Sequence, residues 1–118
     1  FLGEAGFVSG RLTNGHLETA LGLLDTDQLE QGGPDHNGTA IDVLVRPDDL
    51  RATIADETKA NGRVIYREYT GTSFVYRIEL ESGDVVHCEQ NHVERFDLNR
   101  PVQVELTANH PLAWFPTD

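Results

Sequence analysis

Aromatic and aliphatic residues occupy every second position of the segment 74–80, and no other feature constrains the fold of this chain as strongly. Successive side chains of a β-strand point to opposite faces of the sheet, so a period of two predicts a strand with one buried face. Shorter runs of this kind recur along the chain, with turn residues roughly every eight to twelve positions. The sequence therefore predicts an all-β fold, a small barrel or sandwich of about eight or nine short antiparallel strands.

The first strands are predicted to form a hairpin. Asn14-Gly15 separates the segments 7–12 and 16–24. Asn-Gly is the strongest short hairpin signal, because both residues accept positive φ. Beyond the turn, we expect the buried face to be continued by Leu17, Leu21 and Leu23.

Two polar segments interrupt the strands. Residues 25–39 are predicted to form a long loop with one helical turn at 27–30, and residues 55–61 form a second loop. Between them a strand over 40–45 ends at Arg46-Pro47, because proline lacks the N–H of a strand ladder, and a short strand follows up to Ile54. One domain, 1–118, is thus expected, with a first β segment at 1–54 and a second at 62–118. Periodicity leaves open whether they form two sub-barrels or one intertwined body.

The second β segment holds the clearest strands. β-favouring residues fill 62–69, and Gly71 lies in the turn that follows. The alternating strand forms a hairpin through Ser82-Gly83-Asp84 onto 85–89. After a loop at 90–100, the last strands are expected at 102–106 and 112–115.

Charge and hydropathy limit the partners. The chain has 9 Lys and Arg against 20 Asp and Glu, a formal net charge of −11. Such a surface repels polyanions and anionic bilayers, so we expect no nucleic-acid partner. The longest apolar stretches span about five residues, whereas a membrane helix needs about twenty, which predicts a soluble domain without direct membrane insertion. Since the chain contains no Met, we expect it to be a fragment of a longer protein.

No combination of residues indicates metal binding. Of the five histidines, only His87 and His92 lie near Cys88 in the sequence, while His16, His36 and His110 are isolated. His87 and Cys88 are adjacent on a predicted strand and point to opposite faces, so they do not meet at one ion. We expect Cys88 to be a small buried strand residue.

Catalytic and cofactor-binding patterns are also missing. Ser9, Ser73 and Ser82 lack the Gly-x-Ser-x-Gly setting of a nucleophile. Gly32-Gly33 is not followed by the Lys-Ser/Thr pair of a phosphate loop. We therefore predict no catalytic, cofactor-binding or metal-binding residue in this chain.

Two further groups of residues favour structural over ligand-binding roles. Asp25, Asp27, Glu30 and Asp35 share one loop, but the twelfth position of a calcium loop begun at Asp25 is His36 rather than Glu, so a solvated acidic loop is favoured. Aromatic stacking platforms for single-stranded nucleic acid need a basic groove, which this chain lacks. The four central aromatic residues are therefore expected in the core and at an interface: Tyr66, Tyr69, Phe74 and Tyr76.

Several motifs, in order along the chain, resemble one known family. Val43 to Leu50 resembles the "φ-R-P-E/D-x-φ" element in the C-terminal extension of ABC-importer ATPases, and Phe1 to Ala5 resembles the phrase that precedes that extension, with Gly6 replacing its Asn. Residues 62–71 resemble "G-x-V-φ-x-x-x-φ-x-G", and residues 74–83 resemble "φ-x-Y-x-V-x-L-x-x-G". Residues 100–106 and Phe115-Pro116 are similar to the closing strands. The chain thus resembles the transport-associated OB-like (TOBE) domain, most of all that of ferric-iron importer ATPases; sugar, polyamine and thiamine importers are alternatives.

The resemblance implies an OB-like fold and a regulatory role without catalysis. In such importers the C-terminal extensions hold two ATPase subunits together during the ATP cycle, so the implied partners are a second copy, the chain's own ATPase domain and the permease subunits. ATP and Mg²⁺ are implied for the missing ATPase domain only, and the implied location is the cytoplasmic face of the membrane. Its motif residues here have structural roles: Arg46, Pro47, Gly71 and Gly83. The alternative is a sensor of an oxyanion or metal ion, although the "S-A-R-N" motif of molybdate-binding relatives is absent from this sequence.

Overall fold

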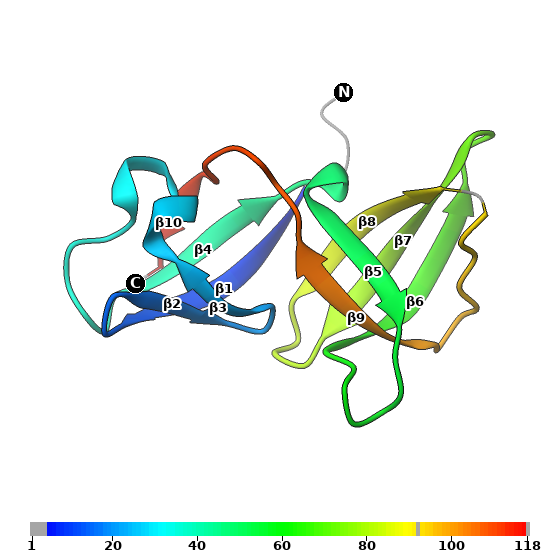
Figure 1. Ribbon diagram of the computed structural model, residues 1–118, viewed down its shortest axis with the longest axis horizontal. Helices are drawn as coiled ribbons and strands as arrows, with labels where there is room; N and C mark the ends of the chain where they lie inside the picture. The colour runs from blue at the N-terminus through cyan, green and yellow to red at the C-terminus, as the bar shows by residue number, and fades with distance from the viewer. Residues whose placement is uncertain (1–4, 92, 118) are drawn as a thin grey trace.

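The protein is all-β and consists of two antiparallel five-stranded sheets, as the computed structural model of residues 5–91 and 93–117 shows (Figure 1). The predicted fold class is confirmed. The first sheet has the order β10-β4-β1-β2-β3, and the second has the order β5-β9-β6-β7-β8. The first sheet contains β1 (Gly6–Thr13), β2 (His16–Thr19), β3 (Gly22–Asp25), β4 (Ala40–Val45) and β10 (Trp114–Pro116). The second contains β5 (Leu50–Ile54), β6 (Gly62–Tyr69), β7 (Ser73–Leu80), β8 (Val85–Asn91) and β9 (Pro101–Leu106).

The hairpin predicted at Asn14-Gly15 is present between β1 and β2. Asn14 has φ 52° and Gly15 has φ 84°, so both central residues lie in the left-handed region that this turn requires. The register pairs Thr13 with His16, and Val8 and Leu12 face the core.

The expectation for Leu23 is wrong. The segment 16–24 is two strands, because Thr19 ends β2: its Oγ1 donates to the carbonyl of Gly22 (2.9 Å) and accepts from the N–H of Leu21 (3.0 Å). This turn resets the alternation, so that Leu24 is buried while Leu23 is 67% exposed. With the segment divided, the described residues contain ten strands rather than eight or nine.

The acidic segment after β3 is more ordered than predicted. In place of one helical turn at 27–30 it forms two short 3-10 turns, η1 (Thr26–Gln28) and η2 (Glu30–Gly32). The carboxylate of Asp25 accepts the N–H of Asp27 at the start of η1. Leu29 lies between the two turns. Its side chain is buried, and its extended backbone forms a β-bridge to Leu112.

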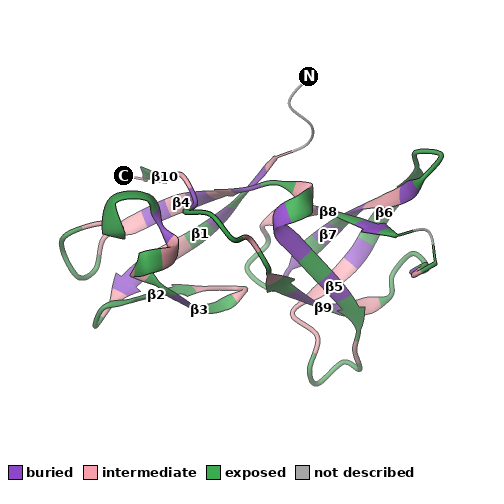
Figure 2. Ribbon diagram, turned by 45° about the horizontal axis from the view of Figure 1, so that its top comes forward, coloured by how far each residue is buried: buried purple, intermediate pink, exposed green. Residues whose placement is uncertain are grey.

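The two sheets do not coincide with the two β segments read from the sequence. β5 follows β4 in the chain but pairs with β9, and β10 follows β9 but pairs with β4. Each half of the chain thus contributes one strand to the other sheet, which makes the domain one intertwined body. The buried hydrophobic residues of both sheets, apart from Leu12, belong to a single cluster, and Figure 2 shows buried residues along the strands of both sheets.

Two crossing linkers and one strand contact join the sheets. The linker between β4 and β5 contains η3 (Pro47–Asp49), and the carbonyl of Asp49 accepts the backbone N–H of Thr107 from the linker between β9 and β10 (2.7 Å). On the other side β1 approaches β8 so closely that a Cβ at Gly6 would lie 2.8 Å from the carbonyl oxygen of Val85. The backbone N–H of Ser9 also donates to Asp84 (3.0 Å).

Side chains close the second sheet into a barrel. β8 and β5 are its edge strands, and the amide of Gln90 on β8 pairs with both backbone polar groups of Ala52 on β5. Gln90 is 4% exposed, so these bonds are shielded from water. The hydroxyl of Tyr76 holds the segment after β8 over one end of the barrel by accepting the N–H of Phe96 (2.9 Å).

Candidate functional site

The outer surface of the barrel carries an exposed arginine stacked on a tyrosine. Arg77 of β7 lies opposite Tyr66 of β6, and its Cζ is 4.5 Å from the centre of the tyrosine ring. Tyr66 is 43% exposed and Arg77 is exposed as well. A guanidinium over an aromatic face is attracted by the ring quadrupole, by about 0.5–1 kcal/mol at an exposed position. The stack holds the cation in place while leaving it open to solvent.

A β-bulge in β6 places Tyr66 on this surface. The register with β7 shifts between Val64 and Tyr66, so Ile65 is an extra residue. Val64 lies opposite Ile78 and faces the core. Without the bulge the same register would place Ile65 opposite Arg77 and turn Tyr66 inward, since a slip of one residue exchanges the two faces of a strand.

The strand register defines the remainder of this surface, which we call the barrel outer face. It consists of the side chains that alternate with the core residues on three neighbouring strands. Two arginines and three glutamates give it a formal charge of −1, against −11 for the whole chain. Its members are Arg63, Tyr66 and Glu68 of β6, Val75, Arg77 and Glu79 of β7, and Val85, His87 and Glu89 of β8.

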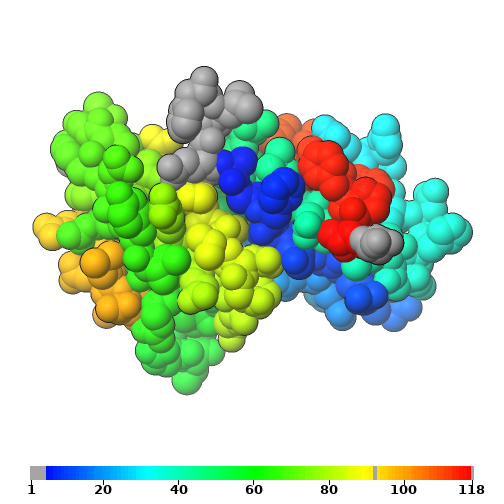
Figure 3. Space-filling model, turned by 180° about the vertical axis from the view of Figure 1, so that it is seen from behind, coloured from blue at the N-terminus to red at the C-terminus, as the bar shows by residue number. Residues whose placement is uncertain are grey.

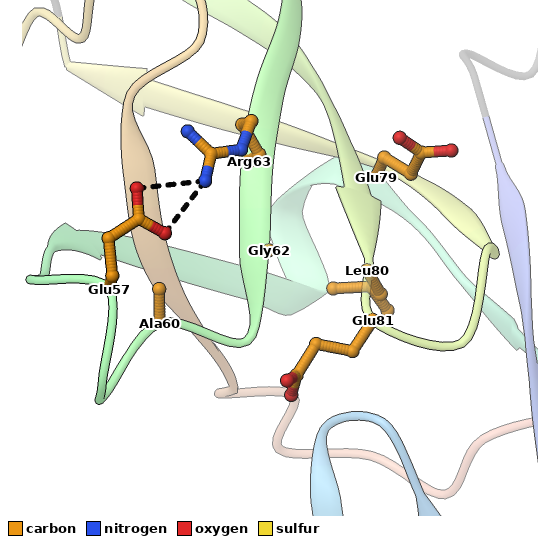
Figure 4. A pocket seen from close by; sticks show the side chains of 7 residues that line it. All are labelled: Glu57, Ala60, Gly62, Arg63, Glu79, Leu80 and Glu81. Carbon is orange, nitrogen blue, oxygen red and sulfur yellow. Dashed lines mark hydrogen bonds and ion pairs between the residues drawn. The ribbon is translucent and has the colours of Figure 1, made fainter.

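A hollow lies at one end of the barrel outer face (Figure 4). Arg63 binds both carboxylate oxygens of Glu57 at 2.8 and 2.9 Å and donates to the carbonyl of Asn99. Figure 4 shows the carboxylates of Glu79 and Glu81 lying apart from this pair. The hollow therefore has three carboxylates and one arginine that is already bound, so its charge disfavours anions.

An apolar cluster adjoins the barrel outer face on the first sheet. Phe7 of β1 and Phe115 of β10 meet edge to face with ring centres 6.1 Å apart, and they are 47% and 51% exposed. Leu44 of β4 lies opposite Phe7 and is partly exposed. Figure 3 shows β1 (blue), β8 (yellow) and the C-terminal segment (red) side by side on one side of the molecule.

Comparison with known protein families identifies the domain. The family model described as TOBE domain matches residues 43–114, from β4 through the whole barrel to the start of β10. This match covers more than half of the chain. The chain belongs to the TOBE domain family. No curated protein matches it. Domains of this family are small regulatory or binding modules and are not catalytic. They occur in ABC transporters and in other proteins.

The motif residues of this TOBE domain lie at strand ends and turns. Pro47 opens η3, and Arg46 caps it through its backbone: the N–H of Arg46 donates to Asp49 (2.9 Å), while the side chain lies on the surface. The Arg46 guanidinium makes no hydrogen bond or ion pair with another described residue. Gly71 (φ 99°) and Gly83 (φ 92°) sit in the turns after β6 and β7, where the backbone favours glycine.

The described histidines of the TOBE domain do not cluster into a metal site. His87 and Cys88 point to opposite faces of β8, and Cys88 is fully buried, as predicted. Burial raises the pKa of the Cys88 thiol to about 12. His16 and His36 are exposed at separate places, and His92 lies outside the described residues. Within 5–91 and 93–117 there is no group of three or more His, Cys, Asp or Glu side chains arranged to hold a metal ion.

The three serines considered as nucleophiles contact carboxylates. The hydroxyl of Ser73 donates to Glu89 (2.8 Å), and that of Ser82 donates to Asp84 (2.8 Å). The hydroxyl of Ser9 lies between Asp42 and Asp84, at 3.4 and 3.3 Å. Gly32-Gly33 ends η2 in the acidic segment, and the residues that follow do not begin a helix.

The aromatic residues divide between core and surface, as expected. Tyr76 is fully buried and Phe74 packs against the core, whereas Tyr66 and Tyr69 are exposed. The sequence did not mark Arg77 as a candidate site residue, because it is one polar position of the alternating strand 74–80. The signal in the sequence was the run Val64-Ile65-Tyr66, where three consecutive β-favouring residues break the period of two.

In the described part of the chain no helix is long and apolar enough to cross a bilayer.

Proposed function

We propose that this TOBE domain is the C-terminal regulatory and dimerisation domain of the ATP-binding subunit of an ABC importer. Its role is to hold two ATPase subunits together when their catalytic domains separate after ATP hydrolysis. Linking two contacts in one chain makes reclosure intramolecular, which raises the effective concentration of the catalytic halves. The observation that carries this proposal is the family match over 43–114.

Ferric iron is the proposed cargo of the importer. The proposal rests on the sequence Arg46-Pro47-Asp48-Asp49-Leu50-Arg51 and on the charged strand 63–69, which are similar to those of the ferric-iron importer ATPases. ATP and Mg²⁺ belong to the ATPase domain of the proposed parent chain. The permease subunits of the importer would then hold this domain at the cytoplasmic face of the membrane.

The alternative function is that of a sensor of an oxyanion or a metal ion. The hollow of Figure 4 does not favour an oxyanion. Its single arginine, Arg63, is already bound by Glu57, and the hollow is lined by two further carboxylates. Isothermal titration with molybdate, sulfate and a ferric chelate tests this alternative directly. Flat traces remove it, and saturable heat with any of the three supports it over the dimerisation role.

The proposed function is tested on the parent protein. Its upstream sequence is expected to contain a phosphate loop, and its purified form is expected to hydrolyse ATP. Deleting residues 1–118 should lower the dimer fraction in the absence of nucleotide, as measured by light scattering, and should reduce ferric-iron uptake in cells. A parent without a phosphate loop, or a deletion that alters neither assembly nor uptake, would overturn the proposal.

A further inference from the structure

We infer that the barrel outer face is the surface on which a second copy of this domain docks, with the Arg77–Tyr66 stack at the centre of the contact. This inference rests on the dimerisation role proposed above and names the surface that performs it.

Charge restricts where two copies can meet. Each copy has a formal charge of −11, so most pairs of surfaces repel one another. On the barrel outer face two arginines oppose three glutamates, and three apolar side chains lie between them. A face with both signs of charge is complementary to itself. A two-fold axis that passes close to a cation of this face sets the cation of one copy near a carboxylate of the other.

Arg77 is the cation available for such a contact. The only described interaction of its guanidinium is the stack on Tyr66, and no carboxylate of residues 5–91 or 93–117 lies within ion-pair distance of it. Arg63, the other arginine of the face, is occupied by Glu57 and Asn99. Stacking fixes the guanidinium plane in advance, so less side-chain entropy is lost when a carboxylate binds. Tyrosine and arginine are also the residues most enriched at energetically dominant interface positions.

Carboxylates to meet Arg77 are present on the same face. Glu68 and Glu79 are both exposed, and neither side-chain carboxylate has a hydrogen bond or ion pair with another described residue. Both are near neighbours of Arg77 on this face. Glu79 is two residues after Arg77 on β7, and Glu68 of β6 lies opposite Val75, which is two residues before Arg77. They are thus near enough for one surface to supply both partners of a symmetric pair.

The area predicts a weak contact for the isolated domain. Three strands about 4.8 Å apart, each contributing about 20 Å of length, expose roughly 300 Å². A stable interface needs about 800 Å² on each partner. In Figure 3, β1 and the C-terminal segment, the elements of Phe7 and Phe115, lie beside β8, and their exposed surface adds to this area. We therefore expect a dissociation constant in the range of about 10 µM to 1 mM, which the linked parent subunits would strengthen by avidity.

The test is sedimentation equilibrium of the 118-residue chain from about 10 µM to 1 mM at an ionic strength of about 0.15 M. The wild-type chain is expected to dimerise, and Arg77→Glu is expected to raise the dissociation constant at least about tenfold. Tyr66→Ala should weaken association because it removes the platform, and Tyr66→Phe should retain it because the ring remains. Lys59→Glu is the matched control: Lys59 is exposed in the loop 55–61 that precedes β6, it is not a member of the barrel outer face, and its replacement changes the net charge equally.

Two results would overturn the inference. A chain that stays monomeric up to 1 mM excludes this contact, whatever the parent protein does. A dimer that Arg77→Glu weakens no more than Lys59→Glu places the contact elsewhere. Circular dichroism of each variant checks that it is folded. Neither result depends on ATP hydrolysis by the parent chain, so a failure here is distinguishable from a failure of the proposed function.

Discussion

Nε2 of His110 lies 2.9 Å from Oδ1 of Asp49, and this contact ties together the two linkers that cross between the sheets. The other ring nitrogen, Nδ1, lies 2.9 Å from the carbonyl oxygen of Pro111. Both neighbours are acceptors, and only the protonated imidazole donates from both nitrogens. The carbonyl of Pro111, the hydrogen bond to Asp49 and the negative charges of Asp49 and Asp48 accordingly raise the pKa of His110 above its usual 6.5.

The contact predicts a loss of stability as the pH rises. Because the folded-state pKa is raised, His110 stabilises the fold fully below about pH 6.5, and this contribution disappears as the pH rises through the folded pKa. The difference in unfolding free energy between wild type and His110→Gln should therefore be largest at about pH 5.5 and should shrink toward pH 8. Urea unfolding at several pH values measures it. A difference that does not change over this range would contradict the prediction.

NMR titration of the imidazole separates the causes of the shift. In Asp49→Asn the charge and the ionic hydrogen bond are lost, but the Pro111 carbonyl remains. The pKa of His110 is then expected to fall toward 6.5 without reaching it. An unchanged pKa in this variant would show that Asp49 has no part in the shift.

Gln90→Leu is expected to open the barrel seam. The Gln90 amide accepts the N–H of Ala52 (3.1 Å) and donates to its carbonyl (3.3 Å), so leucine leaves two buried backbone groups without partners. Each such group costs about 1–3 kcal/mol, which predicts a loss of roughly 2–6 kcal/mol in urea unfolding. Hydrogen exchange of the Ala52 amide should also accelerate. Gln103 of β9 has an exposed side chain, so Gln103→Leu is the control and should change stability by less than about 0.5 kcal/mol.

Tyr76→Phe is expected to release the segment that covers the barrel end. The Tyr76 hydroxyl accepts the N–H of Phe96 (2.9 Å) and donates to the carbonyl of Glu94 (3.3 Å), and its loss leaves that buried N–H unpaired. The predicted loss of stability is about 1–2 kcal/mol, with faster hydrogen exchange in 93–100. Tyr69→Phe removes an exposed hydroxyl bonded to Gly71 and should have little effect. Equal losses for the two variants would count against this role of Tyr76.

Local signals in the sequence predicted those parts of the fold that depend on neighbouring residues. The turn at Asn14-Gly15 follows from the φ values these residues tolerate, and the strand around Tyr76 follows from its alternation. The exchange of β5 and β10 between the sheets was not predictable, because it depends on pairing with strands about fifty or more residues away. Leu23 was misplaced because a hydrogen bond from Thr19, rather than the hydrophobic pattern, ends β2.

The candidate site was predictable only in part. Balanced charge on one sheet face follows from alternation once the strands are paired. The pairing of Tyr66 with Arg77, however, depends on the bulge at Ile65, which changes the face that every later residue of β6 occupies. The closure of the barrel by Gln90 could not be predicted from the sequence either. A glutamine near the end of a strand has no local feature that marks it as a partner for Ala52.

Cys88 is expected to be unreactive until the domain unfolds. Its side chain is fully buried, its Sγ lies 3.2 Å from Oε1 of Gln90, and burial raises its pKa from 9.0 to about 12. The thiolate is the reactive form, so three pKa units reduce its population about a thousandfold near neutral pH. Alkylation with iodoacetamide at pH 8 should therefore be slower by orders of magnitude in the folded chain than in urea. Ser82→Cys, with an exposed thiol in the turn after β7, provides a control that should react within minutes in both states. Rapid alkylation of Cys88 in the folded wild type would show that the seam between β8 and β5 opens readily, in conflict with the closure by Gln90.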